Sequence, residues 1–226
     1  MNELILKGKT TVAGMEVPNI EGGFGKGKKC MLAKDIARIH NIETRKINQT
    51  INRNKRKYNS NSLINVKDNS EFINELKRKG VMSQNAINSS KYIYILNEKG
   101  YMILNQTLEE SSIAESVLEN YFACDIKKYA LVCNRKEILF RLSIQETLEG
   151  ICDVIPQYNI KDYYIDIYIP KYNLAIEFDE GYHKNQSLED KNREKEIKKE
   201  LKCDFVRVDE NMKLELGINK ILKMIF

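Results

Sequence analysis

Two runs of alternating apolar and polar residues, 163–169 and 174–179, constrain the fold more than any other part of the sequence. They are separated by Pro170-Lys171-Tyr172-Asn173, a tetrad that favours a turn. A symmetric hairpin would pair Ile169 with Leu174 and place Asp166 opposite Glu177. The alternation then predicts a polar face that gathers three carboxylates, Asp166, Glu177 and Asp179. The opposite, core face would carry Ile165, Ile167, Ile169, Leu174, Ile176 and Phe178.

The three carboxylates imply a compensating charge or a solvated face, because like charges opposite one another destabilise a pair of strands. A divalent cation would neutralise them, since Mg²⁺ usually takes one or two protein carboxylates together with water and phosphate oxygens. We therefore expect an Mg²⁺ site, at which Mn²⁺ would substitute. The alternative is the solvated outer face of an ordinary hairpin. Imidazole or thiolate metal sites are disfavoured, because the chain has two histidines and five cysteines without a Cys-x-x-Cys pair.

Helical and strand patterns surround the hairpin. Residues 137–149, 188–202 and 213–225 have helical spacing, and residues 154–158 and 205–208 read as short strands. The resulting order, αβββαβα, predicts a small α/β core in the carboxy-terminal part of the chain.

The charge is distributed unevenly along the 226 residues, a length sufficient for two domains. Residues 1–130 hold 21 Lys and Arg against 14 Asp and Glu, whereas residues 131–226 hold 16 against 18. Residues 26–57 carry eleven basic side chains and two acidic ones, which predicts a polyanionic partner. No apolar run approaches the ~20 residues of a membrane span, and the amino terminus lacks secretory features, so we expect a cytoplasmic protein.

The basic segment contains the spacing of two short helices. Residues 31–40 form the first, and a second beginning near Glu43 or Thr44 would bury Ile47 and Ile51. This is the outline of a helix-turn-helix pair that binds double-stranded DNA, although a Lys-rich helix with a solvated face is the alternative. Its other faces would carry Arg45, Lys46, Gln49, Asn52 and Arg53, of which Gln49, Asn52 and Arg53 could read base edges, while Lys55, Arg56 and Lys57 could hold phosphates.

Further elements complete the amino-terminal part. We expect a hairpin over residues 3–17 closed by Pro18, and a mobile basic loop over residues 21–29. Helices are predicted over 70–79, 98–106 and 111–128, with a strand over 91–96.

These stretches resemble the DNA-binding domain of phage antirepressors related to KilA-N and the Bro proteins. The similarity lies in residues 31–42 with the following basic helix, in Tyr94-Ile95-Leu96-Asn97-Glu98-Lys99-Gly100-Tyr101, and in Val117-Leu118-Glu119-Asn120-Tyr121-Phe122. It implies an α+β DNA-binding domain over residues 1–128.

The carboxy-terminal part resembles the PD-(D/E)XK nucleases, nearest to the branch similar to very-short-patch-repair endonucleases. The resemblance rests on Tyr164-Ile165-Asp166, Ala175-Ile176-Glu177-Phe178-Asp179-Glu180-Gly181-Tyr182-His183, Asp190-Lys191-Asn192-Arg193 and Phe205-Val206-Arg207. Glu146 and Gln157 fit the upstream Glu and Gln of that branch. Two departures are the insertion of Glu180 before Gly181 and the presence of Asp179 where the superfamily usually has Lys.

The resemblance implies a role for each of these residues in phosphodiester hydrolysis. Asp166 and Glu177 would be metal ligands, and Glu146 a ligand through water or to a second ion. Asp179 would add a ligand or orient water, and His183 would carry a proton or serve as a structural hydrogen-bonder. Arg193 would clamp phosphate, or pair with Asp190 or Glu196.

We therefore expect a restriction-endonuclease-like core over residues 137–226 and a DNA-binding domain that targets it. The whole chain would be an Mg²⁺-dependent endodeoxyribonuclease of phage or mobile-element origin that acts on double-stranded DNA. We expect no membrane partner, and the sequence is compatible with either a monomer or a homodimer. The alternatives are an antirepressor whose nuclease-derived half is a docking domain, and a restriction or defence nuclease.

Overall fold

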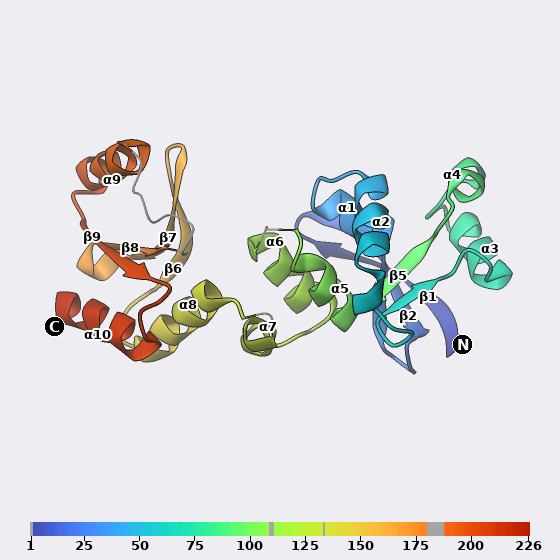
Figure 1. Ribbon diagram of the computed structural model, residues 1–226, viewed down its shortest axis with the longest axis horizontal. Coiled ribbons are helices and arrows are strands. Elements are labelled where there is room, and N and C mark those ends of the chain that lie inside the picture. The colour runs from blue at the N-terminus through green and yellow to red at the C-terminus, as the bar shows by residue number, and fades with distance from the viewer. Residues whose placement is uncertain (1, 109–110, 133, 180–187) are drawn as a thin grey trace. The chain divides into compact units, whose positions relative to one another are not determined.

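The computed structural model describes residues 2–108, 111–132, 134–179 and 188–226. These residues form two compact units, Met1–Tyr129 (unit 1) and Ala130–Phe226 (unit 2) (Figure 1). None of the helices in the described ranges is long and apolar enough to cross a membrane.

Unit 1 is built on a five-stranded antiparallel sheet in the order β1-β2-β3-β5-β4. Ala13 and Gly14, both with positive φ, make the tight turn between the first two strands. The strands are β1 (Asn2–Val12), β2 (Met15–Gly23), β3 (Lys29–Leu32), β4 (Leu63–Asn65) and β5 (Tyr94–Asn97).

The amino-terminal hairpin is longer than expected, because Pro18 does not close it. Pro18 pairs with Lys9 beside a register shift, and pairing with β3 begins only at Ile20. A proline without an N–H is tolerated at such an irregular position of a strand. The expected loop over residues 21–29 is accordingly shortened to the five residues between β2 and β3.

The helices of unit 1 include the two predicted in the basic segment. Their bounds differ slightly from the expectation: Cys30, Met31 and Leu32 pair with β5, so the first helix begins only at Ala33. The expected helix over residues 111–128 is broken, with Ala123 at positive φ. The helical elements are α1 (Ala33–Ile39), α2 (Thr44–Arg53), the 3-10 helix η1 (Lys55–Lys57), α3 (Ser70–Arg78), α4 (Gln84–Ser89), α5 (Glu98–Asn105), α6 (Ser111–Ser116) and the π-helix η2 (Val117–Tyr121), with α7 (Ile126–Val132) spanning the unit boundary.

A buried tyrosine ties the end of unit 1 to its sheet. The Tyr121 hydroxyl donates a hydrogen bond to the Cys30 carbonyl (2.6 Å) and accepts one from the Ile20 N–H (3.2 Å). Further along the chain, the Asn105 amide donates to the Tyr129 hydroxyl (2.7 Å), and both residues are fully buried. The fold of unit 1 therefore depends on residues up to Tyr129.

Unit 2 has the predicted order αβββαβα. Its sheet has the order β6-β7-β8-β9; the first three strands are antiparallel, and β9 is parallel to β8. The elements are α8 (Lys136–Thr147), β6 (Ile155–Ile160), β7 (Tyr163–Ile169), the 3-10 turn η3 (Pro170–Tyr172), β8 (Leu174–Asp179), α9 (Leu188–Leu201), β9 (Asp204–Asp209) and α10 (Leu214–Ile225).

Helices cover both faces of this sheet. Helices α8 and α10 lie on one face and α9 on the other (Figure 1). The first face buries Ile167, Ile169, Leu174 and Ile176 as predicted. Ile165 was predicted on the same face, and this prediction is wrong, because Ile165 packs with Tyr168, Ala175 and Ile197 on the α9 face.

The alternation of β7 fails at Asp166. The predicted register holds for Ile169 with Leu174 and Ile167 with Ile176, where the pairing ends. Asp166 does not pair with Glu177; instead, its Oδ2 accepts a hydrogen bond from the Phe178 N–H (2.8 Å). On the other side of β7, Gln157 of β6 lies between the pairs Pro156–Ile167 and Tyr158–Ile165. Its φ is positive, at 47°. The carboxylate of Asp166 thus accepts the N–H of Phe178, where a backbone carbonyl would accept it in a continuous strand pair. This is the point at which β7 and β8 separate.

We expect Tyr121→Phe to lower the stability of unit 1 by about 1–3 kcal/mol, because it leaves the buried Ile20 N–H and Cys30 carbonyl without their partner. Urea unfolding of the full chain measures this change. Tyr164→Phe is the control, since Tyr164 is exposed. Equal midpoints for the two variants would contradict the assigned role of the hydroxyl.

Candidate functional sites

The three predicted carboxylates lie on neighbouring strands of unit 2, where the pairing of β7 with β8 ends. Asp166 extends from β7, and Glu177 and Asp179 from β8. Glu177 is only 6% exposed, so the alternative of a solvated outer face is wrong at this position. Asp166 is half-buried and accepts hydrogen bonds from the Phe178 N–H and from the Gln157 amide (3.5 Å).

Burial changes the protonation of this cluster. Burial, with a further contribution from the charge of Asp166, raises the pKa of Glu177 from 4.5 to about 7. Burial also raises the pKa of Asp166, opposed by its hydrogen bond from Phe178. Without an additional cation, Glu177 is therefore partly protonated at neutral pH.

Two arginines compensate the cluster. Arg193 of α9 donates from Nη2 to Glu177 Oε1 (2.8 Å) and also to the Tyr164 carbonyl. Arg207 of β9 donates from Nη1 to Asp179 Oδ1 (2.6 Å) and from Nε to Glu194 Oε2 (3.2 Å). Arg193 thus faces the cluster through its contact with Glu177.

Arg207 was not among the predicted site residues. Its place follows from the parallel pairing of β8 with β9, which sets Glu177 beside Arg207. A strand register between segments separated by a helix cannot be read from alternation alone.

Glu137 of α8, which was not among the predicted site residues, reaches the cluster through Gln157. Gln157 Nε2, which contacts Asp166, also lies 3.4 Å from Glu137 Oε1. Glu146 is exposed and, at 3.6 residues per turn, projects about 200° away from the buried Ile144. Glu137 shares the face of Ile144 at a spacing of seven residues, a signal that could have distinguished the two glutamates.

The donor chemistry of the cluster fits Mg²⁺, because two carboxylates are a typical protein contribution. No group of three or more His, Cys, Asp or Glu side chains within the described ranges is arranged to hold a metal ion. His183 and the side chain of Asp190 lie outside the described residues.

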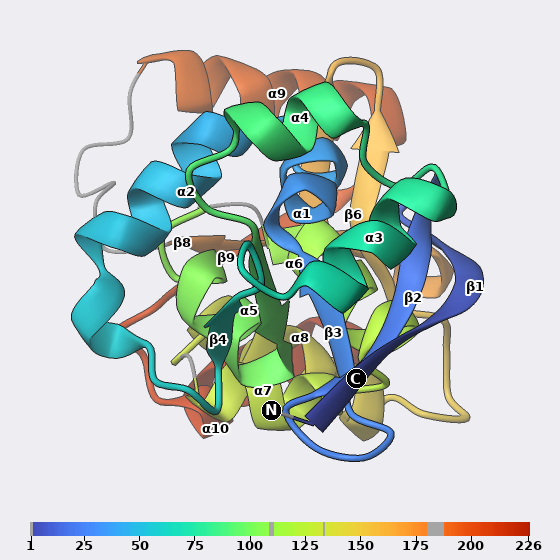
Figure 2. The same cartoon turned by 90° about the vertical axis from the view of Figure 1, so that its right-hand side faces the viewer.

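The basic helix α2 of unit 1 buries Ile47 and Ile51, as predicted. The last turn of α2, which carries Arg53, and η1 lie at one edge of unit 1, apart from α3 and α4 (Figure 2). The predicted DNA-contacting residues that are exposed on α2 and η1 are Arg45, Lys46, Gln49, Arg53, Lys55, Arg56 and Lys57.

Asn52 differs from the other predicted contacts. It is half-buried, and its side-chain oxygen accepts a hydrogen bond from the Tyr94 hydroxyl of β5 (2.8 Å). Asn52 therefore joins α2 to the sheet instead of presenting a free amide on the exposed face. The register of β5 against α2, which decides this contact, is not visible in the spacing of the helix.

The cations of α2 and η1 differ electrostatically from those of α1. Lys34 and Arg38 of α1 both pair with the fully buried Asp35, at 3.2 and 3.1 Å. In the part of the chain that the structure describes, no ion pair joins any of the six cations of α2 and η1 to an acid. Their positive charge is therefore available to an external anion.

Comparison with known proteins assigns part of unit 1. Residues 24–107 match the model of the ORF6N domain family. The match includes α1, α2 and η1, and it leaves out the whole of unit 2. No curated protein and no solved structure matches the chain. The amino-terminal part of this protein is therefore similar to an ORF6N domain, as its resemblance to phage antirepressors led us to expect.

Proposed function

We propose that the chain binds double-stranded DNA through unit 1 and hydrolyses its phosphodiester bonds in unit 2, as a divalent-metal-dependent endonuclease. The observation that carries the proposal is the burial of Glu177 beside Asp166. A buried acid whose pKa is raised toward neutrality and which faces arginines is costly for a structural role and useful for catalysis.

Each residue of the cluster has a role in this reaction. Asp166 and Glu177 would hold Mg²⁺ or Mn²⁺, which when bound supplies an activated water and neutralises charge on the phosphoryl oxygens. Arg193 can exchange Glu177 for a substrate phosphate, because its planar fork suits either partner. Asp179, fixed by Arg207, would orient water, and Glu137 with Gln157 would hold Asp166 in place. His183 remains the proposed proton carrier.

Unit 1 would position this site on DNA. The consecutive helices α1 and α2 suit a helix-turn-helix arrangement, with α2 as the helix that enters the major groove. Gln49 and Arg53 would contact base edges, and Lys55, Arg56 and Lys57 phosphates.

A second candidate is a DNA-binding regulator of the antirepressor type, in which unit 2 is a docking domain. The match of residues 24–107 to the ORF6N family favours it, because the match lies wholly in unit 1. The buried carboxylates favour the endonuclease, since docking does not need a charged group 6% exposed.

The first test is Mg²⁺-dependent cleavage of supercoiled plasmid, with EDTA as the blank. We expect Asp166→Asn and Glu177→Gln to abolish cleavage while leaving DNA affinity intact, because metal ligation and the basic helix lie in separate units. Glu137→Gln should also reduce the rate, because Glu137 contacts Gln157, which in turn contacts Asp166. Undiminished cleavage by the Glu177 variant would refute the site, and absence of cleavage by the unaltered protein would favour the regulator.

The second test concerns pH and stability without metal. Because its folded pKa of about 7 exceeds 4.5, Glu177 contributes stability that is full below pH 4.5 and lost as the pH rises through 7. Relative to Glu177→Gln, the unaltered protein should lose about 2–3 kcal/mol between pH 5 and pH 8. Urea unfolding in EDTA measures the difference, with the exposed Glu149→Gln as the control. Parallel pH profiles for the Glu177 variant and the unaltered protein would contradict it.

The third test concerns the salt dependence of DNA binding. Replacing Lys55, Arg56 and Lys57 by Ala should reduce the slope of log affinity against log salt by about 0.9 for each lost phosphate contact. Titrations of one duplex at several salt concentrations give this slope. The charge-preserving triple variant Lys55→Arg, Arg56→Lys, Lys57→Arg should keep it. An unchanged slope for the alanine variant would show that these cations form only a solvated face.

A further inference from the structure

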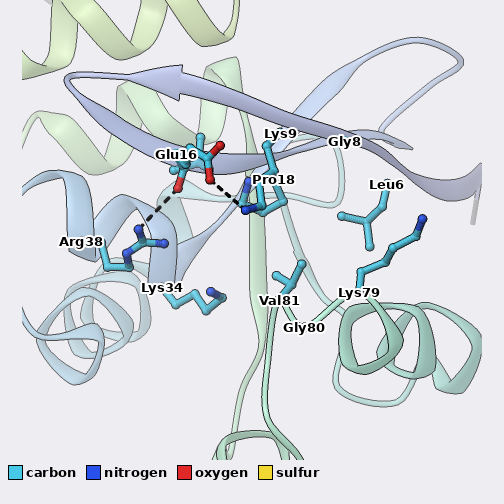
Figure 3. Close-up of a pocket in the computed structure, with 11 residues that line it drawn as sticks. Leu6, Gly8, Lys9, Glu16, Pro18, Lys34, Arg38, Lys79, Gly80 and Val81 are labelled. Atoms are coloured by element: carbon cyan, nitrogen blue, oxygen red, sulfur yellow. Dashed lines mark hydrogen bonds and ion pairs between the residues drawn. The ribbon is translucent and has the colours of Figure 1, made fainter.

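Unit 1 contains a cavity of about 410 Å³ that the proposed DNA interface does not use. The size lies within the range of small-ligand sites, about 300–1,000 Å³. Three separate segments of the chain enclose it: the β1–β2 hairpin, helix α1, and the residues that follow α3 (Figure 3).

One part of the lining is cationic. Lys9, Lys34, Arg38 and Lys79 line the cavity, and Glu16 is the acid among the lining residues. Figure 3 shows Lys9 and Arg38 turned toward Glu16, and the Lys34 ammonium between Arg38 and Val81. The side chain of Glu16 pairs with Lys9 (2.8 Å), while Arg38 donates to its backbone carbonyl (3.4 Å).

These contacts leave positive charge uncompensated. Asp35 is shared by Lys34 and Arg38, so it neutralises one of the two. Lys79 forms no ion pair with any residue in the described ranges. Four cations against Glu16 and Asp35 leave an excess of two positive charges around the cavity.

The rest of the lining is apolar, from Leu6, Val17, Pro18 and Val81. A ligand that satisfies both parts has an anionic head and an apolar body. A phosphomonoester carries about −1.5 to −2 charges at neutral pH, which matches the excess of two, whereas each diester of a DNA backbone carries one. Arginine and lysine side chains both donate charge-assisted hydrogen bonds to phosphate oxygens.

We propose that this cavity binds a small phosphomonoester with an apolar or aromatic body, of the class of a nucleoside monophosphate. The phosphate lies against Lys9, Lys34 and Arg38, and the body against Leu6, Pro18 and Val81. Lys79 lies beside Leu6 on the other side of Val81 (Figure 3) and adds to the positive charge around the cavity. This site belongs to unit 1 alone and does not depend on the metal chemistry proposed for unit 2.

Calorimetric titration of the full chain in EDTA tests the proposal, with 2′-deoxyadenosine 5′-monophosphate as the probe. Deoxyadenosine, which lacks the phosphate, and inorganic phosphate, which lacks the body, are the comparison ligands. The nucleotide should bind more tightly than either. Lack of nucleotide binding, or equal affinity for inorganic phosphate and nucleotide, would overturn the proposal.

Variants locate the binding. Lys9→Gln should weaken nucleotide binding roughly tenfold, the effect of losing one charge-assisted contact, and Lys79→Gln should weaken it less, because Lys79 only adds to the charge around the cavity. Lys77→Gln is the control, because Lys77 is an exposed lysine of unit 1 that does not line the cavity. Thermal unfolding of the three variants should coincide with that of the unaltered protein. Equal affinities for Lys9→Gln and Lys77→Gln would overturn the assignment, as would displacement of the nucleotide by an unphosphorylated duplex, which would reassign the cavity to the DNA backbone.

Discussion

An acid buried within a sheet must be compensated by protons, cations or hydrogen-bond donors, and the arrangement of unit 2 around Glu177 follows from this requirement. Arg193 approaches from α9, and Arg207 on β9 holds the neighbouring Asp179. Asp166 is stabilised by a backbone N–H and a glutamine amide. The elements of unit 2 therefore supply hydrogen-bond donors to a cluster of carboxylates and also enclose a hydrophobic core.

Much of this architecture could be predicted from the sequence, because local periodicity decides it. The bounds of β7 and β8 and the pairing of Ile169 with Leu174 follow from strict alternation around a proline turn. The two helices of the basic segment follow from the spacing of Ile36, Ile47 and Ile51, all fully buried. The grouping of Asp166, Glu177 and Asp179 near one end of the strands was also accessible, since it needs only the hairpin register.

The parts that could not be predicted depend on contacts between distant segments. Alternation assumes continuous pairing, so it misplaced Ile165 where Asp166 replaces a backbone partner. The pattern of acids on α8 did not point to Glu137, because its contact with Gln157 joins distant segments. The hydrogen bond from Tyr94 of β5 to Asn52 was not visible in the spacing of α2. In each case a tertiary contact outweighed a local pattern.

The hydroxyl of Tyr121 has a consequence for the autonomy of the ORF6N-like segment. The family match ends at residue 107, whereas the hydroxyl that bridges Ile20 of β2 and Cys30 of β3 comes from residue 121. A fragment cut at the limits of the match would also lack the whole of β1 and β2, exposing the β3 edge of the remaining sheet. The recognisable motif and the cooperative folding unit are thus different lengths of chain, and only the longer one can be expected to exist as an independent domain.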